Sequence, residues 1–167
     1  MSINLANGIT LSRLMAVPIM FVAIAHEWQM PALVVFGIAC ATDWLDGYVA
    51  RKYNLTTDLG KALDPLVDKL VILAPLLALV ELGQVPAWAV YVILARELLV
   101  TAWRGNSQQG ANVWGKTKTV SQMVAIATLL LQWKYAIYSL YLAVALTLWS
   151  GLSYVLPERN AMGDRSS

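Results

Sequence analysis

The chain has 167 residues, of which 59% are hydrophobic and only 13% are charged. Soluble domains carry about a quarter charged residues, so this composition excludes an ordinary soluble domain and predicts an all-α, polytopic membrane protein. The formal net charge of +2 and the lack of a basic cluster exclude nucleic acid as a partner. The single cysteine, Cys40, lies in an apolar run and is expected to be a small helix residue.

A polar stripe opens the chain and predicts a short interfacial helix over residues 1–13. Four polar residues recur at every third position: Asn4, Asn7, Thr10 and Arg13. The apolar run 14–25 predicts that this helix continues into a first membrane span that contains Pro18. A signal peptide cleaved after Ala25 is disfavoured, because the stripe is regular and further apolar runs follow.

Five further apolar runs predict five more transmembrane helices, which makes six in all. These runs are 31–51, 60–82, 85–103, 118–133 and 135–156. The polar segment 104–116 is expected to be the longest loop, and residues 157–167 a flexible cytoplasmic tail. The whole chain, residues 1–167, is thus expected to form a single membrane domain.

The basic residues predict how this domain is oriented. With six spans, Lys134 is the one lysine or arginine on its side of the membrane, and the others crowd the opposite side. The positive-inside rule makes the crowded side cytoplasmic, together with both chain ends. Trp28, Trp88 and Trp133 fall near predicted span ends, as in an aromatic belt. We expect a multi-pass protein of a bacterial inner membrane.

Four aspartates at the cytoplasmic edge predict a metal site. Asp43 and Asp46 share one helical face, and Gly60, Asp64 and Asp68 repeat at i+4 on the next helix. Four carboxylates at one spot would repel one another strongly, so a cation is implied. Ligands that offer only oxygen suit a hard ion such as Mg²⁺ or Mn²⁺.

The same residues carry a family resemblance. The pattern that resembles the signature of the CDP-alcohol phosphatidyltransferases is Asp43-x-x-Asp46-Gly47-x-x-Ala50-Arg51 followed by Gly60-x-x-x-Asp64-x-x-x-Asp68. Every position of that signature is filled. Four other segments are similar to motifs of the bacterial phosphatidylglycerophosphate synthases within this family: Asn4–Arg13, Ala95-Arg96-Glu97 with Arg104, Gly115-Lys116-x-Lys118-Thr119, and Leu148-Trp149-Ser150.

The resemblance implies a reaction and roles for the aspartates. An acceptor alcohol would attack the β-phosphate of CDP-diacylglycerol and release CMP, with two Mg²⁺ or Mn²⁺ ions on the diphosphate. Asp43, Asp46 and Asp64 are then metal ligands. Asp68 is then the general base and also contacts a metal. A homodimer is implied as well.

The resemblance also assigns a site for CDP-diacylglycerol. Its predicted residues are Thr10, Asp46, Gly47, Ala50, Arg51 and Gly60. Gly47 and Ala50 are small enough for a nucleotide to approach the helix backbone closely. Judged without the resemblance, they are small residues that let membrane helices pack, and Arg51 is an arginine at a span end.

Basic residues beside the aspartates suggest which acceptor is used. Arg96, Arg104, Lys116 and Lys118 form a predicted pocket for an acceptor that carries its own phosphate. Glycerol 3-phosphate is such an acceptor, so phosphatidylglycerophosphate is the expected product. The alternative is that Arg104, Lys116 and Lys118 are ordinary charges at the cytoplasmic edge.

Two other functions stay open at this point. A sister phosphatidyltransferase would use phosphatidylglycerol, inositol phosphate or serine as its acceptor, and the basic pocket argues against serine. A transporter of divalent cations or protons would also carry acids within the membrane. Transport, however, predicts acids spread through the membrane depth, whereas these four are grouped at one edge.

Overall fold

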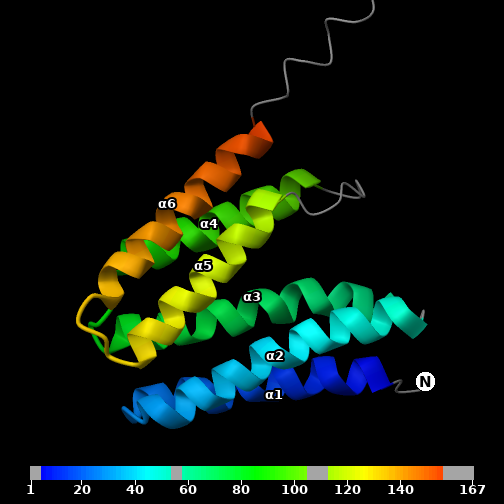
Figure 1. Cartoon of the computed structure of the whole chain (residues 1–167), viewed down its shortest axis with the longest axis horizontal. Helices are drawn as coiled ribbons and strands as arrows, with labels where there is room; N and C mark the ends of the chain where they lie inside the picture. The colour runs from blue at the N-terminus through cyan, green and yellow to red at the C-terminus, as the bar shows by residue number, and fades with distance from the viewer. Residues whose placement is uncertain (1–4, 54–57, 105–112, 156–167) are drawn as a thin grey trace, which may run out of the picture.

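A computed structural model describes three stretches of the chain. Backbone is described for residues 5–53, 58–104 and 113–155, and side chains for residues 12–42, 66–102 and 117–152. Every regular element in these stretches is an α-helix, so the predicted all-α class is confirmed. The helices, shown in Figure 1, are α1 (Leu5–Ala25), α2 (Gln29–Tyr53), α3 (Asp58–Glu81), α4 (Ala87–Arg104), α5 (Val113–Leu130) and α6 (Ala136–Val155).

Three tight turns lie at one end of the molecule and share one way of ending a helix. Glu27, Gly83 and Gln132 follow α1, α3 and α5, and each has a positive φ, of 59°, 70° and 52°. In each turn the next amide donates to the carbonyl five residues earlier, as in a Schellman motif. These bonds are Trp28 N to Ala23 O at 2.8 Å, Gln84 N to Leu79 O at 2.9 Å, and Trp133 N to Thr128 O at 3.1 Å.

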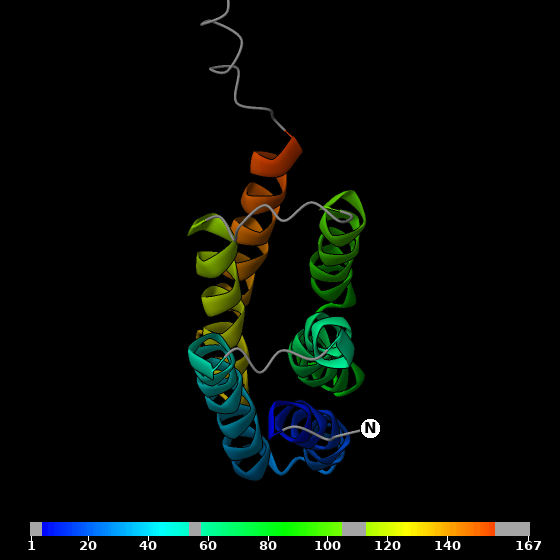
Figure 2. The ribbon, with the colours of Figure 1, turned by 90° about the vertical axis from the view of Figure 1, so that its right-hand side faces the viewer.

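The helices pack in two inclined groups. Helix α1 packs against α2 and α3, whereas α6 packs against α4 and α5. Helix α3 also contacts α4, and α5 contacts both α2 and α3, so these contacts join the groups. Figure 2 shows α1, α2 and α3 gathered below the other three helices. The start of α1, the end of α2, the start of α3, the end of α4 and the start of α5 all lie away from the three tight turns (Figure 1).

Small side chains let the helices approach closely. Several fully or almost fully buried positions are alanines: Ala32, Ala39, Ala78, Ala89, Ala125 and Ala143. Hydrogen bonds that cross from α5 to α6 include Gln122 Nε2 to Thr147 Oγ1 at 2.9 Å and Thr128 Oγ1 with Ser139 Oγ at 2.7 Å. Packing of small residues and short polar bridges therefore holds the bundle together.

One predicted helix course is confirmed and one predicted boundary is corrected by the structure. The first segment was expected to continue as a helix into the apolar run 14–25, and one helix does run from Leu5 to Ala25 with Pro18 inside it. The predicted loop 104–116 is too long, because α5 begins at Val113 and not at Lys118. Residues 157–167, the predicted tail, lie outside the described residues.

The six membrane spans were also expected from the apolar runs. Among the residues described, no helix is both long enough and apolar enough to cross a membrane.

Candidate active site

The backbones of two helices carry the four aspartates. Asp43 and Asp46 lie in α2, and Asp64 and Asp68 lie in α3. The spacing of three residues in α2 and of four in α3 therefore places each pair on one helical face, as predicted. The side chains of Asp43, Asp46 and Asp64 fall outside the described side chains, so their meeting at one spot stays a prediction.

Asp68 is the aspartate whose side chain is described, and it forms an ion pair with α1. Arg13 Nη1 donates to Asp68 Oδ1 at 3.0 Å. The arginine is 3% exposed, whereas half of the aspartate side chain is exposed. A buried guanidinium thus contacts the carboxylate from its packed side and stabilises its charged form.

A second charged cluster links side chains of α4 and α5. Arg96 Nη1 donates to Oε1 of Glu97 at 3.3 Å, and Lys118 Nζ donates to the same oxygen. Both cations are buried, as is most of the glutamate. The structure therefore brings together Arg96 and Lys118, two of the four residues predicted to hold the acceptor phosphate. Glu97 offers one negative charge to these two positive charges.

Helix α6 completes the surroundings of Arg96. Arg96 Nη2 donates to Ser150 Oγ at 2.7 Å in a buried hydrogen bond. The next residue, Gly151, lies directly beside the arginine stem, because a Cβ added there would stand 3.1 Å from Arg96 Cγ. The close approach of α6 thus fixes the guanidinium from two sides.

Helix α3 links the cluster to the aspartate region. The charges of Lys69 and Arg96 both act on the Lys118 ammonium group, so Lys69 lies near the same cluster. Lys69 follows Asp68 directly in the chain. The cluster around Glu97 therefore lies near the part of α3 that carries Lys69 and Asp68.

The other predicted site residues lie on helix backbones without described side chains. Among them, Arg104 is the last residue of α4, and Lys116 is the fourth residue of α5. Lys116 is therefore helical, although the sequence placed it in a loop. The remaining members of this set are Thr10, Gly47, Ala50, Arg51 and Gly60.

The predicted metal site depends on the same aspartates. Within the described side chains, no group of three histidine, cysteine, aspartate or glutamate residues could hold a metal ion. Three of the four predicted ligands lie outside that part of the chain. The donor set on α2 and α3 consists of carboxylates alone, and its chemistry fits a hard divalent cation.

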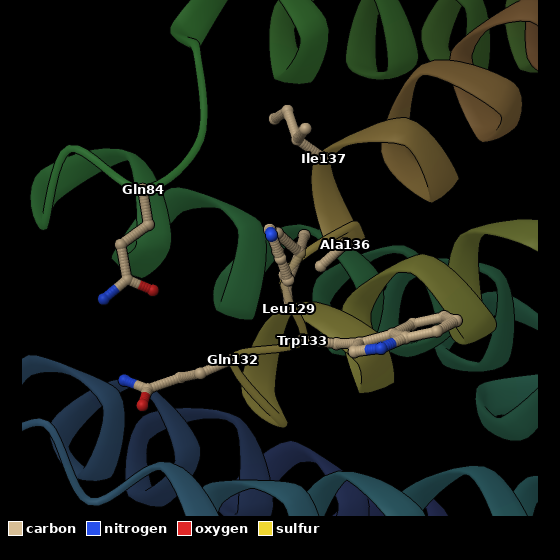
Figure 3. A pocket seen from close by; sticks show the side chains of 7 residues that line it. Gln84, Leu129, Gln132, Trp133, Ala136 and Ile137 are labelled. Carbon is tan, nitrogen blue, oxygen red and sulfur yellow. The ribbon is translucent and has the colours of Figure 1, made fainter.

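A cavity of about 320 Å³ lies at the other end of the helices (Figure 3). Gln84 and Gln132, whose side chains extend from the α3–α4 and α5–α6 turns, line it together with Lys134. Thirteen helical steps of α3 separate Asp68 from Glu81, which is roughly 20 Å at 1.5 Å per residue, and Gln84 follows in the turn. This cavity is therefore separate from the charged clusters.

Sequence reasoning did not assign a site role to three residues that the structure places in these clusters. Arg13 closes the polar stripe of the first helix, and Ser150 ends a segment already matched to a motif. Glu97 belongs to the matched segment Ala95-Arg96-Glu97, and it pairs with Arg96 and Lys118. Ion pairs between helices cannot be read from spacing within one helix, so the stripe and the motif were the only signals for these contacts.

Comparisons with known proteins point to one family. The family model of the CDP-alcohol phosphatidyltransferases matches residues 3–149. The chain is 40% identical to the CDP-diacylglycerol–glycerol-3-phosphate 3-phosphatidyltransferase of Bacillus subtilis, over 90% of this chain and 93% of the relative. It is 33% identical to the enzyme of the same name from Haemophilus influenzae, over 98% of both chains. A third enzyme with this name, from Pseudomonas fluorescens, is 37% identical over 91% of this chain and 88% of its own length.

Proposed function

The chain belongs to the CDP-alcohol phosphatidyltransferase family, and from this premise we propose the reaction that it catalyses. It transfers the phosphatidyl group of CDP-diacylglycerol to sn-glycerol 3-phosphate and forms phosphatidylglycerophosphate and CMP. The names of full-length relatives at 33–40% identity support this assignment. The enzyme is thus a transferase of phospholipid biosynthesis that supplies the precursor of phosphatidylglycerol.

The observation that carries the choice of acceptor is the shared oxygen of Glu97. Arg96 and Lys118 are two buried cations with one carboxylate between them. A phosphate group on the acceptor would offer negative charge and several acceptor oxygens to these two cations. Serine carries no phosphate and inositol none, so neither would offer that charge. Arg104 and Lys116 are proposed as further contacts of the same phosphate.

The aspartates are proposed to act on the other substrate. Asp43, Asp46 and Asp64 would hold the metal, and Asp68 would contact it as well. Members of the family generally depend on a metal ion, and we propose Mg²⁺, or Mn²⁺ in its place, as two ions. When bound, the metal neutralises the diphosphate and lowers the cost of charge on the departing phosphate.

The transfer step assigns a proton and an electron pair to named groups. The Asp68 carboxylate accepts the proton of the acceptor hydroxyl, and the oxygen so released attacks the β-phosphorus of CDP-diacylglycerol. A new phosphorus–oxygen bond forms as the bond to the CMP oxygen breaks, and CMP leaves with that electron pair. Lys69, which follows Asp68 directly in α3, is proposed to help keep anionic substrates there.

The nucleotide is proposed to lie on α2 and the start of α3. Thr10, Asp46, Gly47, Ala50, Arg51 and Gly60 form this proposed site. Gly47 and Ala50 leave room against the helix backbone, and Arg51 would pair with the diphosphate. Helix α1, which packs against both α2 and α3, would place Thr10 at the same end.

An assay with purified protein tests the reaction directly. CDP-diacylglycerol, Mg²⁺ and one labelled acceptor at a time are supplied, and both labelled lipid and released CMP are measured. Glycerol 3-phosphate is expected to give lipid and an equal amount of CMP, whereas inositol phosphate, serine and phosphatidylglycerol give little. Lipid formation from another acceptor but not from glycerol 3-phosphate would overturn the assignment. The same measurement separates an enzyme from a cation transporter, which would release no CMP.

We also propose that the helices lie in a bilayer as six spans. Large apolar side chains are exposed on every helix, and a protein in water seldom exposes so many. Examples from α1 to α6 in order are Ile19, Ile38, Leu66, Leu99, Val124 and Leu142. Trp28, Trp88 and Trp133 are exposed around the three tight turns, where an aromatic belt would contact lipid headgroups.

The proposed orientation places the aspartates and both chain ends on the cytoplasmic side of a bacterial inner membrane. Cysteines introduced singly at Gln132 and at Ala161, in a Cys40→Ala background, would test it in intact cells. A membrane-impermeant maleimide is expected to label position 132 and not position 161. The reverse pattern would invert the topology. The homodimer stays a prediction, which the mass of the protein in detergent would test.

A further inference from the structure

We propose that Arg13 is a positioning residue, which holds the Asp68 carboxylate in the orientation that the transfer reaction needs. The proposal rests on the proposed function, since that function makes Asp68 the proton acceptor. Arg13 would not touch either substrate. Its effect on the reaction would pass through the Asp68 carboxylate.

The ion pair between Arg13 and Asp68 joins a buried side chain to a half-exposed one. Arg13 Nη1 lies 3.0 Å from Asp68 Oδ1, and the two residues come from different helices, 55 positions apart in the chain. The arginine is 3% exposed and the aspartate 50% exposed. The guanidinium therefore reaches the carboxylate from the interface of α1 and α3, while the aspartate retains an exposed side for other partners.

Burial makes the guanidinium a firm support. A buried charge is costly unless an opposite charge lies close by, so separation of Arg13 from Asp68 would cost stability. The planar guanidinium also directs its hydrogen bonds in a fixed geometry, whereas a lysine ammonium acts as a point charge. An arginine at this position can therefore hold the Asp68 carboxylate in one orientation as well as stabilise its negative charge.

The position of α1 brings this support to the proposed reaction centre. Figure 1 shows α1 running beside α3, and α1 begins at the end of the molecule where α2 ends and α3 begins. Asp68 lies one helical turn beyond Asp64 and is followed by Lys69. A change at Arg13 should thus affect the aspartate directly and leave the cluster around Glu97 in place.

A purely structural role is the alternative. An ion pair between α1 and α3 could hold the helices together without affecting Asp68 during the reaction. The two roles differ in their kinetics, because displacement of a reacting group by about 1 Å can slow a reaction by about a hundredfold. They also differ in how the losses combine when both partners are replaced.

The test is a double-mutant cycle on the purified full-length enzyme in detergent with Mg²⁺. The variants are Arg13→Gln, Arg13→Lys, Asp68→Asn and the two combinations with Asp68→Asn. We expect Arg13→Gln to lower kcat by about ten- to a hundredfold. Both KM values should rise or fall by no more than about twofold. Arg13→Lys should regain part of that loss. Each combined variant should be no slower than Asp68→Asn alone.

Three controls separate the possible outcomes. Thermal unfolding shows whether each variant folds, and the Arg13→Lys cycle decides the question if Arg13→Gln does not. Calorimetric binding of CDP-diacylglycerol should be unchanged in Arg13→Lys. Lys134→Gln, in the distant cavity, should keep the kcat of the unmodified protein.

The proposal is overturned if folded Arg13 variants keep their kcat, or if their losses multiply with that of Asp68→Asn. If Asp68→Asn keeps full turnover, the assignment of Asp68 as the general base is wrong, whatever Arg13 does. If the unmodified protein forms no lipid product, the proposed function itself is wrong.

Discussion

Lys118 and Arg96 donate to the same atom, Oε1 of Glu97, although one cation lies in α5 and the other in α4. The contact joins two residues that are predicted to bind the acceptor phosphate. Two buried cations repel each other unless a negative charge lies between them. Glu97 therefore holds Arg96 and Lys118 together, and a phosphate that entered the proposed acceptor pocket would meet both cations.

Replacing Glu97 by glutamine should disturb both stability and acceptor binding. The amide keeps the shape and one acceptor oxygen but removes the negative charge that Arg96 and Lys118 share. We expect the free energy of unfolding to fall by about 3 kcal/mol and the KM for glycerol 3-phosphate to rise by about tenfold. Thermal unfolding in detergent and steady-state kinetics measure these effects. Glu97→Asp, which keeps the charge, is the control, and equal behaviour of the two variants would contradict the electrostatic role.

An alanine at Gly151 should displace Arg96. The new Cβ would lie 3.1 Å from Arg96 Cγ, so the arginine stem must shift by a few tenths of an ångström. We expect a KM for glycerol 3-phosphate raised severalfold and an unchanged KM for CDP-diacylglycerol. Gly37→Ala is the matched control, because no atom lies within 4 Å of a Cβ at that helical position. That control should equal or exceed the stability of the unmodified protein, by up to about 1 kcal/mol. Identical kinetics for both variants would show that the close approach is unimportant.

Asp68→Asn should remove most turnover while nucleotide binding continues. An amide cannot take up the acceptor proton, and loss of general-base catalysis costs about a hundred- to ten-thousandfold in rate. Steady-state kcat and calorimetric binding of CDP-diacylglycerol measure the two properties separately. A variant with normal kcat would exclude Asp68 as the base, and a variant without binding would make it chiefly a ligand.

Asp43→Asn and Asp64→Asn should each abolish the part of CDP-diacylglycerol binding that depends on metal. A carboxylate that becomes an amide loses the charge that a hard cation requires. Calorimetry with Mg²⁺ and with EDTA measures this part as the difference in affinity. Both variants should bind as weakly with Mg²⁺ as the unmodified protein binds with EDTA. If a variant still binds CDP-diacylglycerol more tightly with Mg²⁺ than with EDTA, the replaced aspartate is not a metal ligand.

Arg104→Ala should weaken the acceptor more than the donor. Arg104 ends α4 two turns after Arg96, so its position on the helix suits a second contact with the acceptor phosphate. We expect the KM for glycerol 3-phosphate to rise by about tenfold, which corresponds to one lost charged hydrogen bond. Lys134→Ala at the opposite end of the helices is the control. A parallel rise of both KM values in Arg104→Ala would speak against the acceptor pocket.

The sequence alone determined most of the helical framework and the reaction class. Apolar runs divided by polar breaks gave six helices, and α6, expected over 135–156, is observed from Ala136 to Val155. The start of α5 was predicted five residues late, because Gly115 and Lys116 continue a polar segment that has weak helix propensity. The local pattern of four aspartates with Gly47 and Gly60 was sufficient to indicate the family, since it lies within one short stretch.

Only the tertiary structure decided which charges meet. Arg13 and Asp68 are 55 residues apart, Arg96 and Ser150 are 54 apart, and Glu97 and Lys118 are 21 apart. Helical periodicity tells which residues share a face of one helix, but it does not tell which face of another helix they contact. That choice depends on how α1 packs on α3 and how α4 and α5 pack with α6. The helix packing therefore fixes the supports of Asp68 and Arg96, which the sequence pattern could not reveal.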